Sequence, residues 1–327
     1  MQKIYQLVNE RICESRETDG PILVYVNPDK TECRHLVDTY RIDEHTLTSA
    51  LDPDEISRLE FEPDHTAVIL KRPKNYSSMD DLLFKVTSLG FFIFADRMII
   101  VMAEEIQIFE LDAKHAMKIK NIKDAFLKIL FGTISHFLMH LKIINQISET
   151  LEQKINTSME NKYLLNMFTL QKSLVYYLNG ITYNATLFER MKNATAKMGF
   201  SPEQFEQLED TIIENNQCLK QADIYTNILS GVMDARASIV NNNLNLLIKR
   251  LTIINIVFLP ITFIASMLGM SEFTLMTQRF PMWLSYGAFA IAMTAIAFGT
   301  YLVVRKINYE RQKKNRLPKP EKRRDRH

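Results

Sequence analysis

Cysteine, tryptophan and glycine are scarce in this sequence, and what is missing narrows the class of protein. The 327 residues include nine glycines, one tryptophan and three cysteines, at Cys13, Cys33 and Cys218. An odd number of widely spaced cysteines outside any CxxC pattern indicates neither a disulfide framework nor a zinc site, so we expect reduced thiols. The sequence also lacks a P-loop, a dinucleotide-binding fingerprint and a readable nucleophile–base arrangement, and we expect no enzymatic activity.

Net charge is small as well, but the formal value of +2 hides an asymmetry. Residues 305–327 hold eleven Lys or Arg against three acids, a charge of +8, which leaves −6 for the rest of the chain. Basic tails bind either nucleic acid or anionic lipid. Because this tail directly follows an apolar run, we expect it to contact membrane lipids and expect no nucleic-acid partner.

Two uncharged apolar runs near the C-terminus are long enough to cross a membrane. Leu251–Met270 has about the 20 residues that cross roughly 30 Å of hydrocarbon, and Trp283–Val304 is a second such run. The pair Lys249–Arg250 precedes the first run and the basic tail follows the second, so the positive-inside rule predicts that both termini are cytoplasmic. Met1–Glu10 lacks the apolar core of a signal peptide, which agrees with an N-terminal part that stays inside.

The first apolar run continues a long helix that we expect to begin at Ser201. Ser201 can cap the helix, Pro202 is tolerated at the first helical position, and Gln204 can close a capping box. From Gln204 to Leu259 there is no proline, and Gly231 is the only glycine. At roughly 1.5 Å per residue, a helix as far as Ser271 would be on the order of 100 Å long. The sequence therefore predicts a stalk that starts in water and ends across the membrane.

The polar residues of the first run share one face of this helix. Thr252, Asn255, Thr262 and Ser266 follow one another in steps of 3, 7 and 4. Polar side chains inside a membrane avoid lipid, so this face either lines water or contacts another helix. One helix cannot form a pore, and the water-lined interpretation therefore requires an oligomer. Pro260 interrupts the helix hydrogen bonds and can kink the span.

The N-terminal part predicts an α/β sheet domain. Asp43 is positioned to cap a helix over Glu44–Leu51, and Asp96–Arg97 is expected at a turn. The predicted strands are Ile22–Val26, Thr66–Lys71, Leu83–Ser88, Phe91–Ala95 and Met98–Met102.

Helical spacing replaces the strand signals from about Ile119. A polar break at 156–158 divides this region into two long helices, the second of which we expect to run through Met198 and to end at Gly199, a residue suited to the left-handed C-cap position. These two helices are expected to form a hairpin beside the stalk.

This layout, together with Leu251–Ser271, resembles the CorA family of divalent-cation transporters. The resemblance rests on Leu251–Ile254, Pro260–Ala265, Gly269–Met270, two C-terminal spans and a basic end, with Leu51–Asp52–Pro53 in the sheet domain. It implies a funnel-shaped homopentamer in which the stalk and first span of each subunit line a central pore. Transport in that family is passive and driven by the membrane potential.

The expected division of the chain follows from this layout. It comprises a cytoplasmic α/β domain at 1–118, a helical hairpin at 119–200, a stalk helix at 201–250, a pore-lining span at 251–270, an external loop at 271–282, a second span at 283–304 and a basic cytoplasmic tail at 305–327.

The expected selectivity loop, Gly269, Met270, Ser271 and Glu272, departs from the family signature, which ends Gly-Met-Asn. Mg²⁺ holds its water shell tightly, so a pore mouth selects it by offering hydrogen-bond acceptors to the hydrated ion. A Ser hydroxyl reaches less far than an Asn amide, which puts Mg²⁺ selectivity in question. Either Ser271 and Glu272 build the mouth together, or the loop no longer selects strongly.

The resemblance also places a set of stalk and span residues toward the pore axis. Leu251 and Leu259 would be hydrophobic constrictions, and Asn255 either forms an additional polar ring or bonds between helices. The expected pore-lining residues are Asn245, Ile248, Leu251, Asn255, Leu259, Thr262 and Ser266.

Stalk carboxylates in the family bind regulatory Mg²⁺ between subunits and hold the pore shut. Asp210 and Asp234 fit that role, with Asp80 or Asp81 as a partner from the sheet domain, although carboxylates on exposed helices are commonly just solvated. Loss of the ion would leave these carboxylates to repel one another and would open the pore.

His136 and His140 are spaced i and i+4 on a helix, a two-ligand pattern for Zn²⁺. No third ligand accompanies them in the sequence, and a packed or surface pair explains them better.

Together with the two apolar runs, the resemblance to the CorA family implies a pentameric channel of the inner or plasma membrane that conducts divalent cations, Mg²⁺ before others, and is gated by cytoplasmic divalent ions. One alternative is a transporter of Zn²⁺, Co²⁺ or Ni²⁺. Another is a non-conducting, membrane-anchored sensor or scaffold of the same fold, against which the aligned polar residues of the first span argue.

Overall fold

The computed structural model describes residues 1–15, 17, 19–76, 82–106, 108–109, 118–157, 161–268 and 281–314. The chain divides into two compact units, Met1–Asp234 and Ala235–His327, and helix α6 (Pro202–Leu268) contributes to both. The predictions made for Asp80, Asp81 and 269–272 lie outside the described residues.

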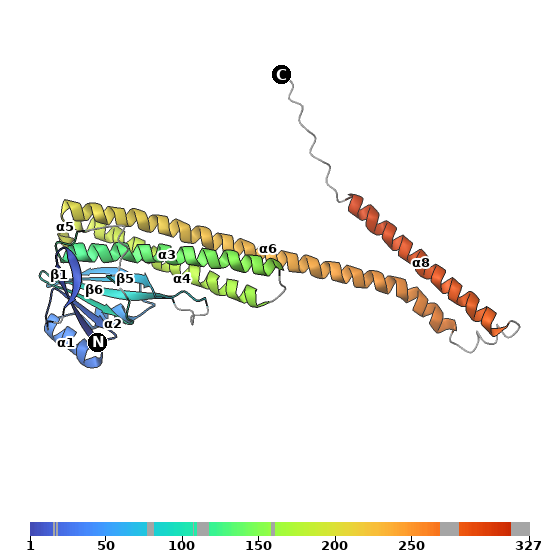
Figure 1. Ribbon diagram of the computed structural model, residues 1–327, viewed down its shortest axis with the longest axis horizontal. Coiled ribbons are helices and arrows are strands. Elements are labelled where there is room, and N and C mark those ends of the chain that lie inside the picture. Colours follow the sequence, from blue (N-terminus) through green and yellow to red (C-terminus); the bar gives the residue numbers. More distant parts are fainter. Residues whose placement is uncertain are drawn as a thin grey trace, which may run out of the picture. The chain divides into compact units, whose positions relative to one another are not determined.

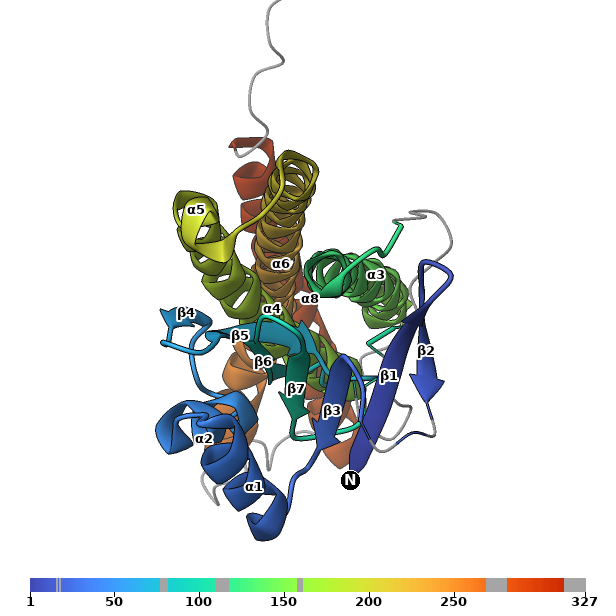
Figure 2. The same cartoon turned by 90° about the vertical axis from the view of Figure 1, so that its left-hand side faces the viewer.

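Unit 1 is built on a seven-stranded sheet with the order β2-β1-β3-β7-β6-β5-β4 (Figure 2). Neighbouring strands are antiparallel except β3 and β7, which are parallel. The strands are β1 (Gln2–Val8), β2 (Arg11–Ser15), β3 (Ile22–Val26), β4 (Arg58–Phe61), β5 (Thr66–Pro73), β6 (Val86–Ile93) and β7 (Met98–Met102).

Helices cover both faces of this sheet, because its central strands are apolar on both sides. In β3, Ile22 and Val24 belong to one core, whereas Leu23 and Tyr25 belong to the other. Helices α1 (Lys30–Tyr40) and α2 (Glu44–Leu51) cover one face, as Figure 2 shows, and the long helices cover the other. Strands buried on two sides read as continuous hydrophobic runs, which is why β3 and β7 were predicted with their observed bounds.

The predicted strands Leu83–Ser88 and Phe91–Ala95 are wrong as separate elements. The structure has one strand, β6, which continues through Gly90. A Cβ atom added at Gly90 would lie 2.4 Å from the Cβ of Ala50 on α2, so the glycine allows close contact between helix and sheet and does not end a strand.

Strands β1, β2 and β4 were not predicted. They lie at the two ends of the sheet, and none of their residues is fully buried. These strands lack the continuous apolar runs by which β3 and β7 were predicted, and β4 is only four residues long.

Two long helices, α3 (Ile122–Thr157) and α4 (Asn161–Asn193), form the predicted hairpin region, and they lie beside the first part of α6 (Figure 1). The expectation that the second helix continues through Met198 is wrong, because α4 ends at Asn193 and a short helix α5 (Thr195–Met198) follows. Gly199 does take the predicted left-handed C-cap conformation, with φ of 61°.

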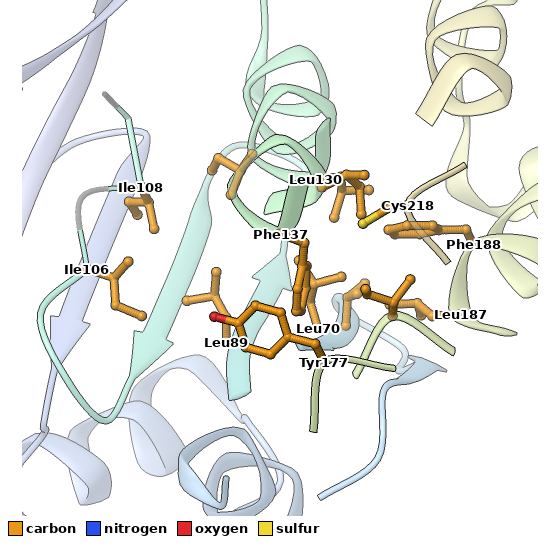
Figure 3. Close-up of a cluster of buried hydrophobic side chains, with 14 of the residues drawn as sticks. Leu70, Leu89, Ile106, Ile108, Leu130, Phe137, Tyr177, Leu187, Phe188 and Cys218 are labelled. Atoms are coloured by element: carbon orange, nitrogen blue, oxygen red, sulfur yellow. The ribbon is translucent and has the colours of Figure 1, made fainter. Parts of the chain in front are cut away.

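The long helices and the sheet share one hydrophobic core. Phe137 of α3, Tyr177 of α4 and Leu70 of β5 converge in it (Figure 3). The inner face of α6 joins this core through Leu208, Ile212, Cys218, Ala222 and Leu229. The part of α6 in unit 1 is therefore an integral part of the folded domain.

Unit 2 contains the remainder of α6 and helix α8 (Met282–Lys314). In contrast to α6 within unit 1, the described side chains of α6 in unit 2 are exposed or only partly buried.

Candidate functional site

The candidate site is the exposed surface of α6 in unit 2, where all seven predicted pore-lining residues lie. Each of the seven side chains is exposed in the single chain, and Leu251 and Leu259 retain 61% and 69% of their accessible surface. Helix α8 is similarly uncovered, with Trp283 at 76%. Uncovered apolar surface of this extent is typical of contact with a membrane or with other subunits.

Three helices among the described residues are long and apolar enough to span a membrane, at Ile122–Ile155, Pro202–Ser266 and Trp283–Val303. Their burial separates them, since 56% of the most apolar window of the first helix is buried inside the protein, against 0% for the other two. The first helix is α3, whose apolar residues pack on the sheet and on α4. From composition alone, α3 would have been counted wrongly as a membrane span.

Two threonines on this surface donate hydrogen bonds to their own helix. Thr252 Oγ1 donates to the carbonyl oxygen of Ile248 at 2.8 Å, and Thr262 Oγ1 donates to that of Phe258 at 2.9 Å. A hydroxyl has one proton and two lone pairs. With the proton committed to the backbone, each exposed hydroxyl oxygen is left as an acceptor.

The two predicted regulatory carboxylates of the stalk, Asp210 and Asp234, are exposed on α6 within unit 1. No ion pair to either is found among the described residues, and those residues contain no group of three or more His, Cys, Asp or Glu side chains placed to hold a metal. A single subunit therefore does not assemble a ligand set around Asp210 or Asp234 from the residues that the structure describes.

His136 and His140 form a packed pair between α3 and α4. Their Nε2 atoms lie 3.0 Å apart, and Nδ1 of His140 bonds the Tyr177 hydroxyl at 2.6 Å. Burial, followed by the nearby Arg72 guanidinium, lowers the pKa of His140 to about 4. Burial also lowers the pKa of His136, with smaller contributions from His140 and Arg72. The positive charge of Arg72 disfavours a bound cation, so this geometry supports the packed-pair interpretation over a Zn²⁺ site.

Sequence reasoning did not single out Asn184, which connects α4 to the sheet. Its Oδ1 accepts from the Lys71 amide at 2.9 Å and from Ser57 Oγ at 2.8 Å, and its Nδ2 donates to the Lys71 carbonyl at 2.7 Å. The pairing of β4 with β5 ends at Ile69, so Asn184 supplies the partners that Lys71 would otherwise lack. Only an unexpected polar residue on the apolar face of α4 could have indicated this role.

The fold and the uncovered helices together define an integral membrane protein with a large N-terminal α/β domain and two apolar C-terminal helices. The model of the family described as "CorA-like Mg2+ transporter protein" matches residues 22–306. The chain belongs to this CorA family. It is accordingly a CorA-like divalent-cation transporter and not an enzyme.

Comparison with individual proteins agrees with this assignment. The "Cobalt/magnesium transport protein CorA" of Methanocaldococcus jannaschii is 24% identical over 239 residues, which cover 69% of this chain and 71% of that protein. The complete structure of the CorA magnesium transporter from the same organism has a TM-score of 0.74 at 19% identity, covering 93% of this chain and 96% of that one.

Two further solved structures share the fold. The full-length CmaX protein matches with a TM-score of 0.68 at 14% identity, over 92% of this chain and 95% of that chain. The cytoplasmic domain of ZntB from Vibrio parahaemolyticus matches with a TM-score of 0.56 at 12% identity, over 74% of this chain and 98% of that domain. These similarities establish the fold of α/β domain, stalk helix and C-terminal helices.

Proposed function

We propose that this protein is a homopentameric channel that passes Mg²⁺ down its electrochemical gradient. The observation that carries the proposal is the exposed, uncharged face of α6 in unit 2, on which polar residues alternate with Ile248 and Leu259. Several copies that turn this face to a common axis would enclose a polar path with hydrophobic constrictions, while the apolar remainder contacts lipid or α8.

We further propose a topology and a division of the subunit. Residues 251–270 and 283–304 would span an inner or plasma membrane, with 271–282 outside and both termini, including the basic tail at 305–327, in the cytoplasm. The pairs Lys249–Arg250 and Arg305–Lys306 support this orientation, because positive charge near the ends of spans is retained inside. The α/β domain at 1–118, the hairpin at 119–200 and the stalk at 201–250 would then be cytoplasmic.

Residues Gly269, Met270, Ser271 and Glu272 are proposed to form the selectivity loop, with Ser in place of the Asn of the family signature. The Ser271 hydroxyl offers a shorter acceptor than an amide, and the Glu272 carboxylate offers a negative field beside it. A ring of this kind attracts hydrated divalent cations but discriminates among them less sharply.

Mg²⁺ is also proposed as the regulator. Asp210 and Asp234 are exposed on the stalk, where a neighbouring subunit, through Asp80 or Asp81, can supply the oxygen ligands that one subunit lacks. Hard divalent cations bind such oxygen sets, and carboxylates repel when the ion leaves, so falling cytoplasmic Mg²⁺ would open the channel.

Ion uptake by liposomes that contain the purified protein tests the proposal. Uptake of Mg²⁺, Co²⁺, Ni²⁺ and Zn²⁺ is compared for the wild type and Ser271→Asn. We expect Mg²⁺ uptake by the wild type and a sharper preference for Mg²⁺ in the variant, because the amide reaches further into the path. A wild type that prefers Zn²⁺, Co²⁺ or Ni²⁺ would favour the alternative transporter, and no uptake of any ion by either protein would favour a non-conducting sensor or scaffold.

A further inference from the structure

A pocket of unit 1 contains none of the predicted pore-lining or regulatory residues. It has a volume of about 490 Å³, which is within the range of small-molecule sites, and it lies where β4, at one end of the sheet, meets the end of α4 and the short helix α5 (Figure 2). Its lining includes Leu59 and Phe61 of β4, Arg190 and Asn193 of α4, and Ala196 and Lys197 of α5. Apolar, amide and cationic side chains therefore meet in one pocket.

The alternation of side chains along β4 gives this pocket an apolar floor. Leu59 and Phe61 lie on the same side of the strand, and Leu59 packs against the larger core. Glu60 lies on the opposite side, where it accepts a hydrogen bond from Thr46 Oγ1 at 3.0 Å and pairs with Arg58. The one carboxylate of β4 is thereby directed away from the pocket.

Two cations at the pocket are available to an anion. Arg190 and Lys197 are exposed, and neither forms an ion pair with any residue that the structure describes. Lys192 lies between them in the sequence, but it is already paired with Glu209 at 2.8 Å. No carboxylate is among the described residues that line the pocket. Asn193, three residues after Arg190 on α4, adds an amide that can donate to the same anion.

Phe61 adds a surface on which a planar group can stack. Its side chain retains 38% of its accessible surface, and Lys197 Nζ lies 5.4 Å from the centroid of its ring. Such a contact alone does not indicate a site, since Lys172 Nζ lies 5.7 Å from the ring centroid of Tyr176 and neither of these residues lines the pocket. At Phe61 the contact is combined with a second cation and a pocket of ligand size. Nucleobases stack on aromatic rings, and phosphates bind Arg and Lys.

We propose that this pocket binds a nucleoside polyphosphate such as ATP, with the base against Phe61 and Leu59 and the phosphates held by Arg190 and Lys197. Inorganic triphosphate would use the cations alone, and adenosine would use the apolar floor alone. A ligand that joins the two parts loses its translational freedom only once and gains both sets of contacts. The pocket belongs to unit 1, and binding to it can be measured without ion flux.

Isothermal titration calorimetry on the purified full-length protein in detergent tests the proposal. Divalent cations are removed, so that the proposed Mg²⁺ sites cannot hold the phosphates. We expect saturable binding of ATP, with adenosine and inorganic triphosphate each bound roughly tenfold more weakly. Arg190→Gln and Lys197→Gln should each weaken ATP binding roughly tenfold, because each variant lacks one charge-assisted contact.

Lys172→Gln is the matched control, because it removes the same charge and the same kind of ring contact from α4 outside the pocket. This variant should bind ATP as wild type does. Ala196→Phe is a second test, since it fills the pocket without changing the charge and should abolish ATP binding. The thermal midpoint of each variant shows that it is folded.

Absence of saturable ATP binding to the wild type at millimolar concentrations would overturn the inference. Triphosphate binding as tight as that of ATP would also overturn it, because the pocket would then be a general anion site. Equal losses of affinity in Lys172→Gln and Lys197→Gln would show an effect of net charge, and undiminished binding to Ala196→Phe would place the ligand elsewhere. None of these results contradicts the proposed channel, which ion uptake tests separately.

Discussion

Buried polar side chains in unit 1 connect elements that hydrophobic packing alone would leave free to shift. Asn184 is fully buried and holds the main chain of Lys71, and His140 bonds Tyr177 across the interface of α3 and α4. A buried polar group without a partner costs about 1–3 kcal/mol, so these pairings favour one packing of the helices over its alternatives. Sequence could show that these residues are polar, but not which partners they meet.

The histidine pair makes stability depend on pH. The pKa of His140 in the folded protein, about 4, lies below the value of 6.5 for a free histidine, so the unfolded state binds more protons between those values. The free energy of unfolding should therefore fall as pH decreases from 6.5 toward 4, by about 3 kcal/mol in all for His140. We expect the fall in thermal midpoint between pH 7 and pH 5 to be smaller for His140→Gln than for wild type, measured in detergent.

His35→Gln is the matched control, because His35 is exposed on α1. The fall in thermal midpoint between pH 7 and pH 5 should be the same for this variant as for wild type. An unchanged pH dependence in His140→Gln would show that His140 does not contribute to acid sensitivity.

The start of α6 shows how a local sequence signal is coupled to tertiary structure. The predicted capping box is confirmed, since Ser201 Oγ accepts from the Gln204 amide at 3.2 Å and Gln204 Oε1 accepts from the Ser201 amide at 3.0 Å. Gln204 Nε2 also donates to Asp124 Oδ1 at 2.6 Å, and Asp124 Oδ2 accepts from the amides of Lys120 and Asn121. The caps of α3 and α6 are therefore connected, which the sequence pattern did not reveal.

Removal of this cap should destabilise unit 1 measurably. Ser201→Ala leaves the Gln204 amide without its acceptor, and we expect a loss of about 1 kcal/mol in stability, seen as a lower thermal midpoint of the purified protein. Ser201→Asp should retain most of the wild-type midpoint, because aspartate caps a helix equally well. Equal losses in both variants would argue that the hydroxyl acts through some contact other than the cap.

At the scale of the whole molecule, the proposed regulation requires a ligand set that spans subunits. Asp210 and Asp234 are exposed in one copy and lie on the helix whose continuation forms the candidate conduction surface. Lysine at both positions would place permanent positive charge where the regulatory ion is expected, and an ammonium group cannot act as a ligand for Mg²⁺.

We expect Asp210→Lys with Asp234→Lys to alter the response to internal Mg²⁺. In excised patches, currents at high internal Mg²⁺ should be several-fold larger than in wild type, because the ion can no longer hold the closed state. Asp223→Lys, which changes another exposed aspartate of α6, should gate normally. If internal Mg²⁺ blocks the double variant as strongly as it blocks the wild type, neither aspartate has the proposed regulatory role.

The sequence by itself determined the features that depend on local patterns. Strands β3 and β7 are uninterrupted apolar runs, the cap at Ser201 is a three-residue spacing, and the polar residues of the first apolar run follow helical periodicity. Such signals can be recognised without knowledge of distant contacts, because each follows from the geometry of one element.

Only the tertiary structure decided the features that depend on contacts between segments distant in the sequence. It joined the pieces around Gly90 into one strand, because α2 needs that close contact, and it showed that α3 is a core helix although its composition fits a membrane span. It also placed Asn184 beside the end of β5, where β4 no longer pairs with that strand. In each case the deciding quantity is burial against a remote element, which composition and spacing along the chain do not contain.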